Sequence, residues 1–305
     1  MRNSESEHDV CHPMEPRIEI AVRIVAFAAV FAGMAAWEIL APRRHLTAGR
    51  KPRWPGNLGI VVIDALLVRL VIPTTAAGAA LIAAQHGWGL FHALAFPPWL
   101  AGVAGFLLLD LIIYGQHVMF HHVPILWRLH RMHHADLDID VTTGARFHPI
   151  EILLSMLIKI AAVLVLGIPA LAVVIFEVVL NATSMFNHSN VVMPERLERV
   201  LRAIVVTPDM HRVHHSIVRR ETDSNFGFNL PWWDRLFGTY RPAPEAGHVG
   251  MTIGIPMFRA PRELRLDRLL TQPFRNDQAA GEVRVPMPSK LDTDPGRPVG
   301  GENPS

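Results

Sequence analysis

Histidines at helical spacing are concentrated in the middle of this chain. Of its seventeen histidines, eleven lie between residues 117 and 215. One group has the pattern His-x-x-x-His at 117–121, and two groups have the pattern His-x-x-His-His at 130–134 and 211–215. Side chains three or four residues apart lie on one face of a helix, so the rings within each group can converge. Imidazole binds first-row transition metals well, and the spacing therefore predicts a metal site.

The number of histidines indicates two metal ions rather than one. A single zinc ion is saturated by three or four protein ligands, and the three groups together contain more than that. Two further histidines stand singly, His148 before Pro149 and His188 after Asn187. His122 has no partner at ligand spacing, which favours a supporting or structural role for it.

Several other chemistries lack the residues they need. Cys11 is the only cysteine, which excludes an internal disulfide and any cysteine-based zinc or iron–sulfur site. The metalloprotease pattern His-Glu-x-x-His is absent. A net charge of +2 gives no reason to expect nucleic acid as a partner.

Long apolar runs must position the histidines. Half of the residues are hydrophobic and only 18% are charged. The apolar residues gather at 18–42, 58–85, 94–114 and 150–187. Each run matches or exceeds the roughly 20 residues with which a helix crosses a bilayer, and Gly167-Ile168-Pro169 divides the last run as the turn of a hairpin would. The sequence therefore predicts an all-α integral membrane protein with four to five transmembrane helices, the last two of them a hairpin.

Charge and histidine positions predict the same membrane topology. The short loop after the first span, residues 43–53, is rich in arginine, and short basic loops favour the cytoplasmic side. Counting spans from this loop brings all the histidine groups to the cytoplasmic face, so we expect a cytosolic, histidine-rich helical cap. Ionisable residues inside the spans should face the bundle interior or reach the membrane surface, because charge is costly in lipid. These residues are Asp64, Arg69, Asp110, Lys159 and Glu177.

The order of the motifs resembles the fatty acid hydroxylase superfamily, which includes sterol desaturases, sphingolipid and fatty acid hydroxylases and carotene hydroxylases. The resemblance covers roughly residues 100–242 and rests on the three histidine boxes in order, with a membrane hairpin before the last box. Shorter matches accompany the boxes: Leu126-Trp127-Arg128, Arg146-Phe147-His148-Pro149 with Glu151, Asn187-His188-Ser189-Asn190, Thr207-Pro208, Asn225-Phe226-Gly227 and the run from Trp233 to Thr239.

The resemblance implies a non-haem di-iron centre that uses O₂ and two electrons to break an unactivated C–H bond. His188 matches an additional family histidine at the end of the hairpin, and the resemblance leaves open whether His148 binds iron or supports a ligand. By match to the family boxes, the other iron ligands are His117, His121, His130, His133, His134, His211, His214 and His215.

Polar residues near the boxes are expected to hold the rings in place. A ring nitrogen that does not bind the metal needs an acceptor to fix its tautomer. Glu151, Asp209 and Asn225 are candidates for this supporting role, and Asp223 is a further candidate that could equally lie at the surface.

By these criteria the chain has five parts. They are a polar N-terminal tail (1–16), N-terminal transmembrane helices (17–93), a fatty acid hydroxylase-like catalytic domain (94–242), a C-terminal extension (243–273) and a disordered tail rich in Pro, Gly, Asp and Arg (274–305).

The sequence and the resemblance together predict a membrane-bound oxidoreductase of lipid metabolism. It would hydroxylate or desaturate a sterol, a fatty acyl chain, a sphingolipid or a carotenoid, with hydroxylation preferred. Because the sequence shows no haem motif, dinucleotide fingerprint or cysteine cluster, a separate ferredoxin or flavin reductase is expected to supply electrons. The expected location is a bacterial inner membrane, with the active site facing the cytoplasm.

Two other functions remain open from the residues alone. A histidine-rich membrane metal-binding or transport protein is one, although transport should place the ligands near the bilayer midplane and here they lie beyond the span ends. A zinc-dependent membrane hydrolase is the other, although nine histidines exceed what one zinc ion needs.

Overall fold

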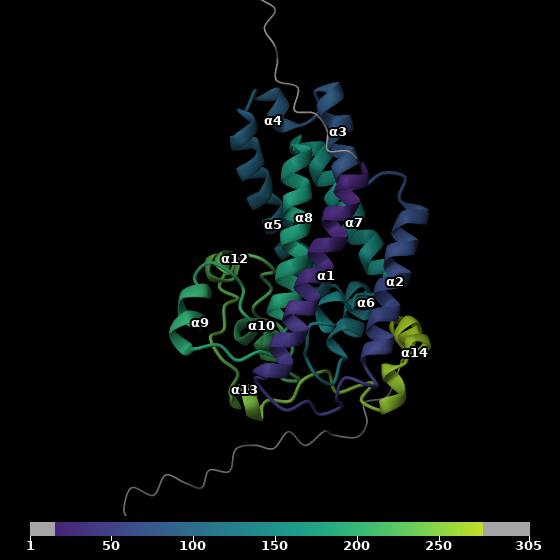
Figure 1. Cartoon of the computed structure of the whole chain (residues 1–305), viewed down its shortest axis with the longest axis vertical. Coiled ribbons are helices and arrows are strands. Elements are labelled where there is room, and N and C mark those ends of the chain that lie inside the picture. Colours follow the sequence, from purple (N-terminus) through teal and green to yellow (C-terminus); the bar gives the residue numbers. More distant parts are fainter. Residues whose placement is uncertain (1–15, 277–305) are drawn as a thin grey trace, which may run out of the picture.

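The computed structural model describes residues 16–276, and every regular element within them is a helix (Figure 1). Two isolated backbone bridges pair Pro42 with Val191 and Ser216 with Ile253. The expected polar tail at 1–16 and the expected disordered tail at 274–305 lie almost wholly outside the described residues.

Five segments are long and apolar enough to cross a membrane. Their helices are α1 (Pro16–Leu40), α2 (Trp54–Val71) with α3 (Ala76–His86) and α4 (Leu90–Ala93), α5 (Pro98–His122), α7 (Pro149–Leu166) and α8 (Ala170–Asn187). In Figure 1, α1, α5, α7 and α8 run along the long axis of the molecule. The predicted all-α integral membrane fold is confirmed.

The expected span 58–85 is divided into two helices. Pro73 follows Ile72, which is extended with ψ 115°, as residues before proline usually are. The next helix, α3, begins at Ala76, and Thr75 caps it: its side chain accepts a hydrogen bond from the Gly78 N–H at 3.0 Å. The apolar pattern continues across this break, so hydrophobicity alone did not reveal it.

The outer surfaces of the long helices are apolar. The exposed fractions of Ile24, Leu70 and Trp99 are 63%, 82% and 71%. A soluble protein rarely exposes so many large apolar side chains together, whereas lipid tails are as apolar as leucine and solvate them well.

Helices α7 and α8 form the predicted hairpin, which is confirmed. Gly167 ends α7 with φ 71°, a left-handed conformation that glycine adopts without steric cost, and Pro169 precedes α8. The buried alanines of α3 let this helix pack against both α7 and α8.

A cap of short elements gathers at one end of the bundle, where Figure 1 shows α6, α9, α10, α13 and α14. Its elements are α6 (Pro124–His134), η1 (Thr143–Ala145), α9 (Glu195–Leu201), α10 (Pro208–His214), α11 (Arg219–Thr222), α12 (Trp232–Leu236), α13 (Gly247–Gly250), η2 (Pro261–Leu264), α14 (Leu266–Thr271) and η3 (Gln272–Phe274).

A buried ion-pair cluster ties the basic loop after α1 to the segment that follows α6. Arg53 is fully buried, and its guanidinium donates to Asp136 Oδ1 at 2.6 Å and to Asp140 Oδ2 at 2.6 Å. Burial alone would raise the pKa of Asp136, but Arg53 and Arg146 hold it below its usual value, so the carboxylate stays charged. Asp138 accepts from the backbone N–H of Thr47 at 2.6 Å. The sequence identified this loop as basic but gave no sign of these partners.

Removing the central cation of this cluster should destabilise the protein strongly. Arg53→Met keeps side-chain volume but leaves buried Asp140 without this cation and Asp136 with Arg146 as its remaining cation, and we expect the free energy of unfolding to fall by about 3 to 5 kcal/mol. Reversible unfolding in mixed micelles measures this change. Arg262→Met is the matched control, because the Arg262 side chain is 72% exposed, and an equal loss in both variants would contradict the assignment.

Candidate metal centre

Nine buried histidines lie close together at the ends of four helices, α5, α6, α8 and α10. The last turns of α5 carry His117 and His121, and His188 is the C-cap residue of α8. The other six lie on α6 and at α10: His130, His133, His134, His211, His214 and His215. All nine are at most 4% exposed.

Local sequence explains how these helices meet. Val123 is the C-cap of α5, and Pro124 begins α6 at once, so the chain turns sharply between the first two boxes. The turn sets residues thirteen apart opposite each other: His117 faces His130, and His121 faces His134. Thr207 caps α10 by accepting from the Met210 N–H, with Pro208 in the first helical turn.

The nine histidines form two groups, each of which could hold one metal ion. The larger group contains His117, His121, His130, His134 and His214, and the smaller contains His133, His188, His211 and His215. Within each group the candidate ligand atoms all lie within 4.8 Å of one another.

Oxygen acceptors fix the protonation of most of these rings. The Nδ1 atoms of His117, His188 and His214 each lie 2.7 Å from a backbone carbonyl, those of Phe226, Ser184 and Ser224. His133 Nδ1 lies 3.0 Å from the Arg146 carbonyl, and His130 Nδ1 lies 2.7 Å from Glu151 Oε1. A carbonyl can only accept, so in the four rings that face one the proton sits on Nδ1 and the lone pair is on Nε2. An ionised Glu151 fixes His130 in the same way.

These lone pairs point at one another. The Nε2 atoms are 3.1 Å apart for His117 and His130 and 3.1 Å apart for His133 and His188. With both protons held on Nδ1, neither atom of a pair can donate, so these contacts are not hydrogen bonds. A first-row metal–imidazole bond of about 2.1 Å places two ligands at right angles about 3.0 Å apart. The observed spacing therefore fits a cation between the rings.

Burial keeps the rings neutral. It lowers the pKa of His130 and of His188 to about 3. The pKa values of His133, His211 and His215 are also lowered well below the usual range by burial. Neutral imidazole is the form that binds a metal ion.

The expected supporting residues divide into one that contacts the cluster and two that do not. Glu151 contacts His130, as described above. Asp209 instead binds two arginines, with Arg43 Nε donating to it at 3.0 Å and Arg212 as its second partner. Asn225 braces the backbone: its amide donates to the Met210 carbonyl at 2.8 Å.

Two other expected residues take clear positions. Asp223 Oδ1 lies 3.3 Å from His121 Nδ1, so it faces the cluster rather than only the surface. His148 lies outside both histidine groups. Its Nδ1 accepts from the Ile150 N–H at 3.2 Å and its Nε2 lies 3.2 Å from the Leu270 carbonyl, so the ring caps α7.

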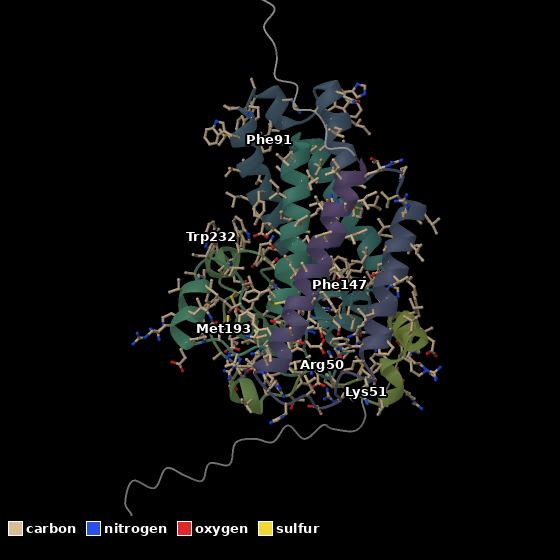
Figure 2. The ribbon with its side chains drawn as sticks, in the orientation of Figure 1. Arg50, Lys51, Phe91, Phe147, Met193 and Trp232 are labelled. Atoms are coloured by element: carbon tan, nitrogen blue, oxygen red, sulfur yellow. The ribbon has the colours of Figure 1, made fainter. Side chains whose placement is uncertain are left out.

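A cavity of about 420 Å³ adjoins the larger histidine group. His117 and His130 form part of its wall, together with Phe120, Phe147 and Phe228. In Figure 2, Phe147 lies between the level of Phe91 and that of Arg50 and Lys51 at the cap end. The cavity continues between the membrane helices to Lys159 and Glu177, two of the ionisable residues expected to face inward.

Replacing Glu151 should weaken metal binding without removing a ligand. In Glu151→Ala, His130 loses the acceptor that orients it, and we expect the metal affinity to fall about 10- to 100-fold. Glu151→Gln keeps an acceptor oxygen and should lose less. Competition with a coloured chelator measures both affinities, and an unchanged affinity in Glu151→Ala would show that the contact does not orient the ring.

Acid should destabilise the protein in the range where unfolded histidines titrate. His130 and His188 have folded pKa values of about 3, against about 6.5 when unfolded. Between these values the unfolded chain binds more protons, so stability is highest above pH 6.5 and falls as the pH drops. The thermal unfolding midpoint, measured at pH 7.5, 6.0 and 5.0, should decrease steadily.

His122→Gln serves as a control for this pH profile, because the His122 side chain is exposed. The substitution should leave the change of the unfolding midpoint with pH as it is in the wild type. The Asp136 carboxylate, whose pKa is lowered in the fold, acts only below about pH 4 and does not contribute in this window. The decrease should be smaller in His188→Gln than in the wild type, and an equal decrease in both would contradict the burial of a neutral His188.

Comparison with known proteins identifies the segment that carries the histidines. Residues 102–239 match the family model described as fatty acid hydroxylase. The chain is 32% identical over 152 residues to an ornithine lipid hydroxylase of Rhizobium tropici, a match that covers 49% of this chain and 45% of the relative. It is 32% identical over 164 residues to an alkylglycerol monooxygenase of Homo sapiens, covering 53% of this chain and 35% of the relative.

A cholesterol 25-hydroxylase of Rattus norvegicus is 28% identical over 142 residues, covering 46% of each chain. The chain thus spans less than half the length of each of these relatives. No solved structure matches it. The histidine boxes, the hairpin and the family match fall on the same residues, and the segment 102–239 is similar in sequence to the fatty acid hydroxylase family.

Proposed function

We propose that this chain is a membrane-bound, non-haem di-iron oxygenase that hydroxylates a lipid. The observation that carries the proposal is the pair of buried histidine groups whose bare ring nitrogens face one another beside a cavity between membrane helices. The family match and the relatives' printed names support oxygenase chemistry on lipids.

The donor set supports two iron ions rather than one zinc ion. Nine neutral imidazoles are divided into groups of five and four, more than a zinc hydrolase requires. The nine assigned ligands are the histidines of these two groups. When bound, the iron pair supplies the chemistry by which O₂, two electrons and two protons convert a C–H bond into C–OH and release one water molecule.

The surrounding residues hold and screen the reacting region. Glu151 and the Phe226 carbonyl orient the two histidines that border the cavity. Phe120, Phe147 and Phe228 line the same space and exclude water from it. Because the cavity lies among the membrane helices, a lipid can reach it from the bilayer without crossing water.

Hydroxylation is favoured over desaturation by the three relatives described above, whose names are those of hydroxylases or monooxygenases. The proposed electron donor is a separate protein, a ferredoxin or a flavin reductase. The proposed location is a bacterial inner membrane with the cap in the cytoplasm, which the basic loop 43–53 supports.

Metal content tests the proposal. Wild-type protein purified in detergent should contain close to two irons per chain by plasma mass spectrometry. His214→Ala removes a residue of the larger group and His133→Ala one of the smaller, and both should lose iron together with O₂-dependent lipid hydroxylation.

His122→Ala is the matched control, because His122 lies on the same helix as His117 and His121 but is exposed. It should keep both irons. A single zinc ion in the wild type, or metal retained in both ligand variants, would refute the di-iron centre and favour a hydrolase or a metal transporter.

A further inference from the structure

The cavity beside His117 and His130 contains acceptors that nothing in the described fold satisfies. Its wall includes Asp64 from α2, Gln116 from α5 and Glu151 from α7. Asp64 Oδ1, Gln116 Oε1 and Glu151 Oε2 are buried and accept no hydrogen bond from any residue between 16 and 276. Asp64 and Glu151 are 8% and 4% exposed.

The cations of the same cavity are already engaged. Lys159 Nζ lies 2.6 Å from Glu177 Oε1, and Arg23 Nη2 lies 2.7 Å from Glu177 Oε2. Arg23 also pairs with Glu19 at 2.9 Å. The protein therefore supplies paired cations in one part of the cavity wall and unpaired acceptors in another.

Unpaired acceptors in a buried, largely apolar space are costly. A buried polar group without a partner loses about 1 to 3 kcal/mol, and a charged group loses more. Native folds satisfy nearly all such groups, so three on one cavity wall indicate that a donating molecule, water or a ligand, occupies this space. Two of the three belong to carboxylic groups, which favours a positively charged donor over a neutral hydroxyl.

We propose that this cavity binds the ammonium-bearing headgroup of a lipid, with its N–H groups donating to Asp64 and to the free oxygens of Gln116 and Glu151. The headgroup, rather than the acyl chain, then lies beside His117 and His130. Phe27, Met156 and Leu180 line the rest of the cavity and contact the adjoining methylene groups. This inference rests on the proposed function, since it names the class of substrate for that site.

Three probes with one chain length separate charge from hydrogen bonding. Octadecylamine carries both charge and N–H donors, octadecan-1-ol carries a donor without charge, and octadecyltrimethylammonium carries charge without a donor. Full-length protein in nanodiscs is incubated with each probe, and the retained probe per protein is measured by mass spectrometry. The wild type should retain octadecylamine at least about tenfold better than the other two, as a hydrogen bond to a charged group allows.

Asp64→Asn should reduce this preference strongly, because it removes the negative charge and keeps only one acceptor oxygen. Gln116→Met, which removes a different acceptor, should reduce the preference and provides the test if Asp64→Asn does not fold. Asp267→Asn is the control, because Asp267 is an exposed carboxylate on α14 whose side chain is 59% exposed. It should behave as wild type.

Metal content is measured on the same samples. Equal retention of the three probes, or an unchanged preference in both cavity variants, overturns the headgroup assignment even when two irons are present. Equal retention of octadecylamine and octadecyltrimethylammonium overturns the claim that the headgroup N–H groups donate hydrogen bonds to the cavity. Absence of iron with a clear amine preference would instead refute the proposed function and leave the headgroup site standing.

Discussion

The interaction on which this structure depends is the repulsion between bare imidazole nitrogens in a buried space. Five of the nine clustered rings are held with Nδ1 against a carbonyl or carboxylate oxygen, and two pairs of their Nε2 atoms then face each other 3.1 Å apart. Protonation could relieve the repulsion, but burial opposes it, as the pKa of His188 near 3 indicates. A metal cation between the rings would satisfy these nitrogen atoms. Neither ring of such a pair offers the other a donor.

The acceptors that enforce this arrangement come from loops, and this explains the rest of the cap. The carbonyls of Arg146 and Phe226 are backbone groups in the loops after η1 and α11, so those loops must be held in register with the histidines. The first is clamped by Arg53 through Asp136 and Asp140. The second is held by Asp234, which accepts from the Phe226 N–H at 2.8 Å. An ion-pair cluster and a buried carboxylate thus hold the backbone groups that orient the rings.

The sequence predicted what periodicity and residue type encode. Helical spacing identified the histidine boxes, Gly167 and Pro169 marked the hairpin, and the apolar runs gave the spans. It could not reveal that Asp209 binds arginines, because an acidic side chain near a box is compatible with either partner. Backbone acceptors such as the Ser224 carbonyl carry no residue-type signal at all. The break at Pro73 was hidden because apolar residues continue on both sides of it.

Membrane burial connects the metal centre to the cavity. The low dielectric that keeps histidines neutral also strengthens every electrostatic interaction in the adjoining space. Lys159 and Glu177 lie within the helices and compensate each other at 2.6 Å, so they add polarity without net charge. Asp64 has no such partner among the described residues. The cavity wall is mostly apolar. It is neutral where its cations lie and acidic near the histidines. Such a cavity selects ligands by the position of their charge as well as by their length. The same helices that exclude water from the histidines therefore also determine which end of a lipid can approach them.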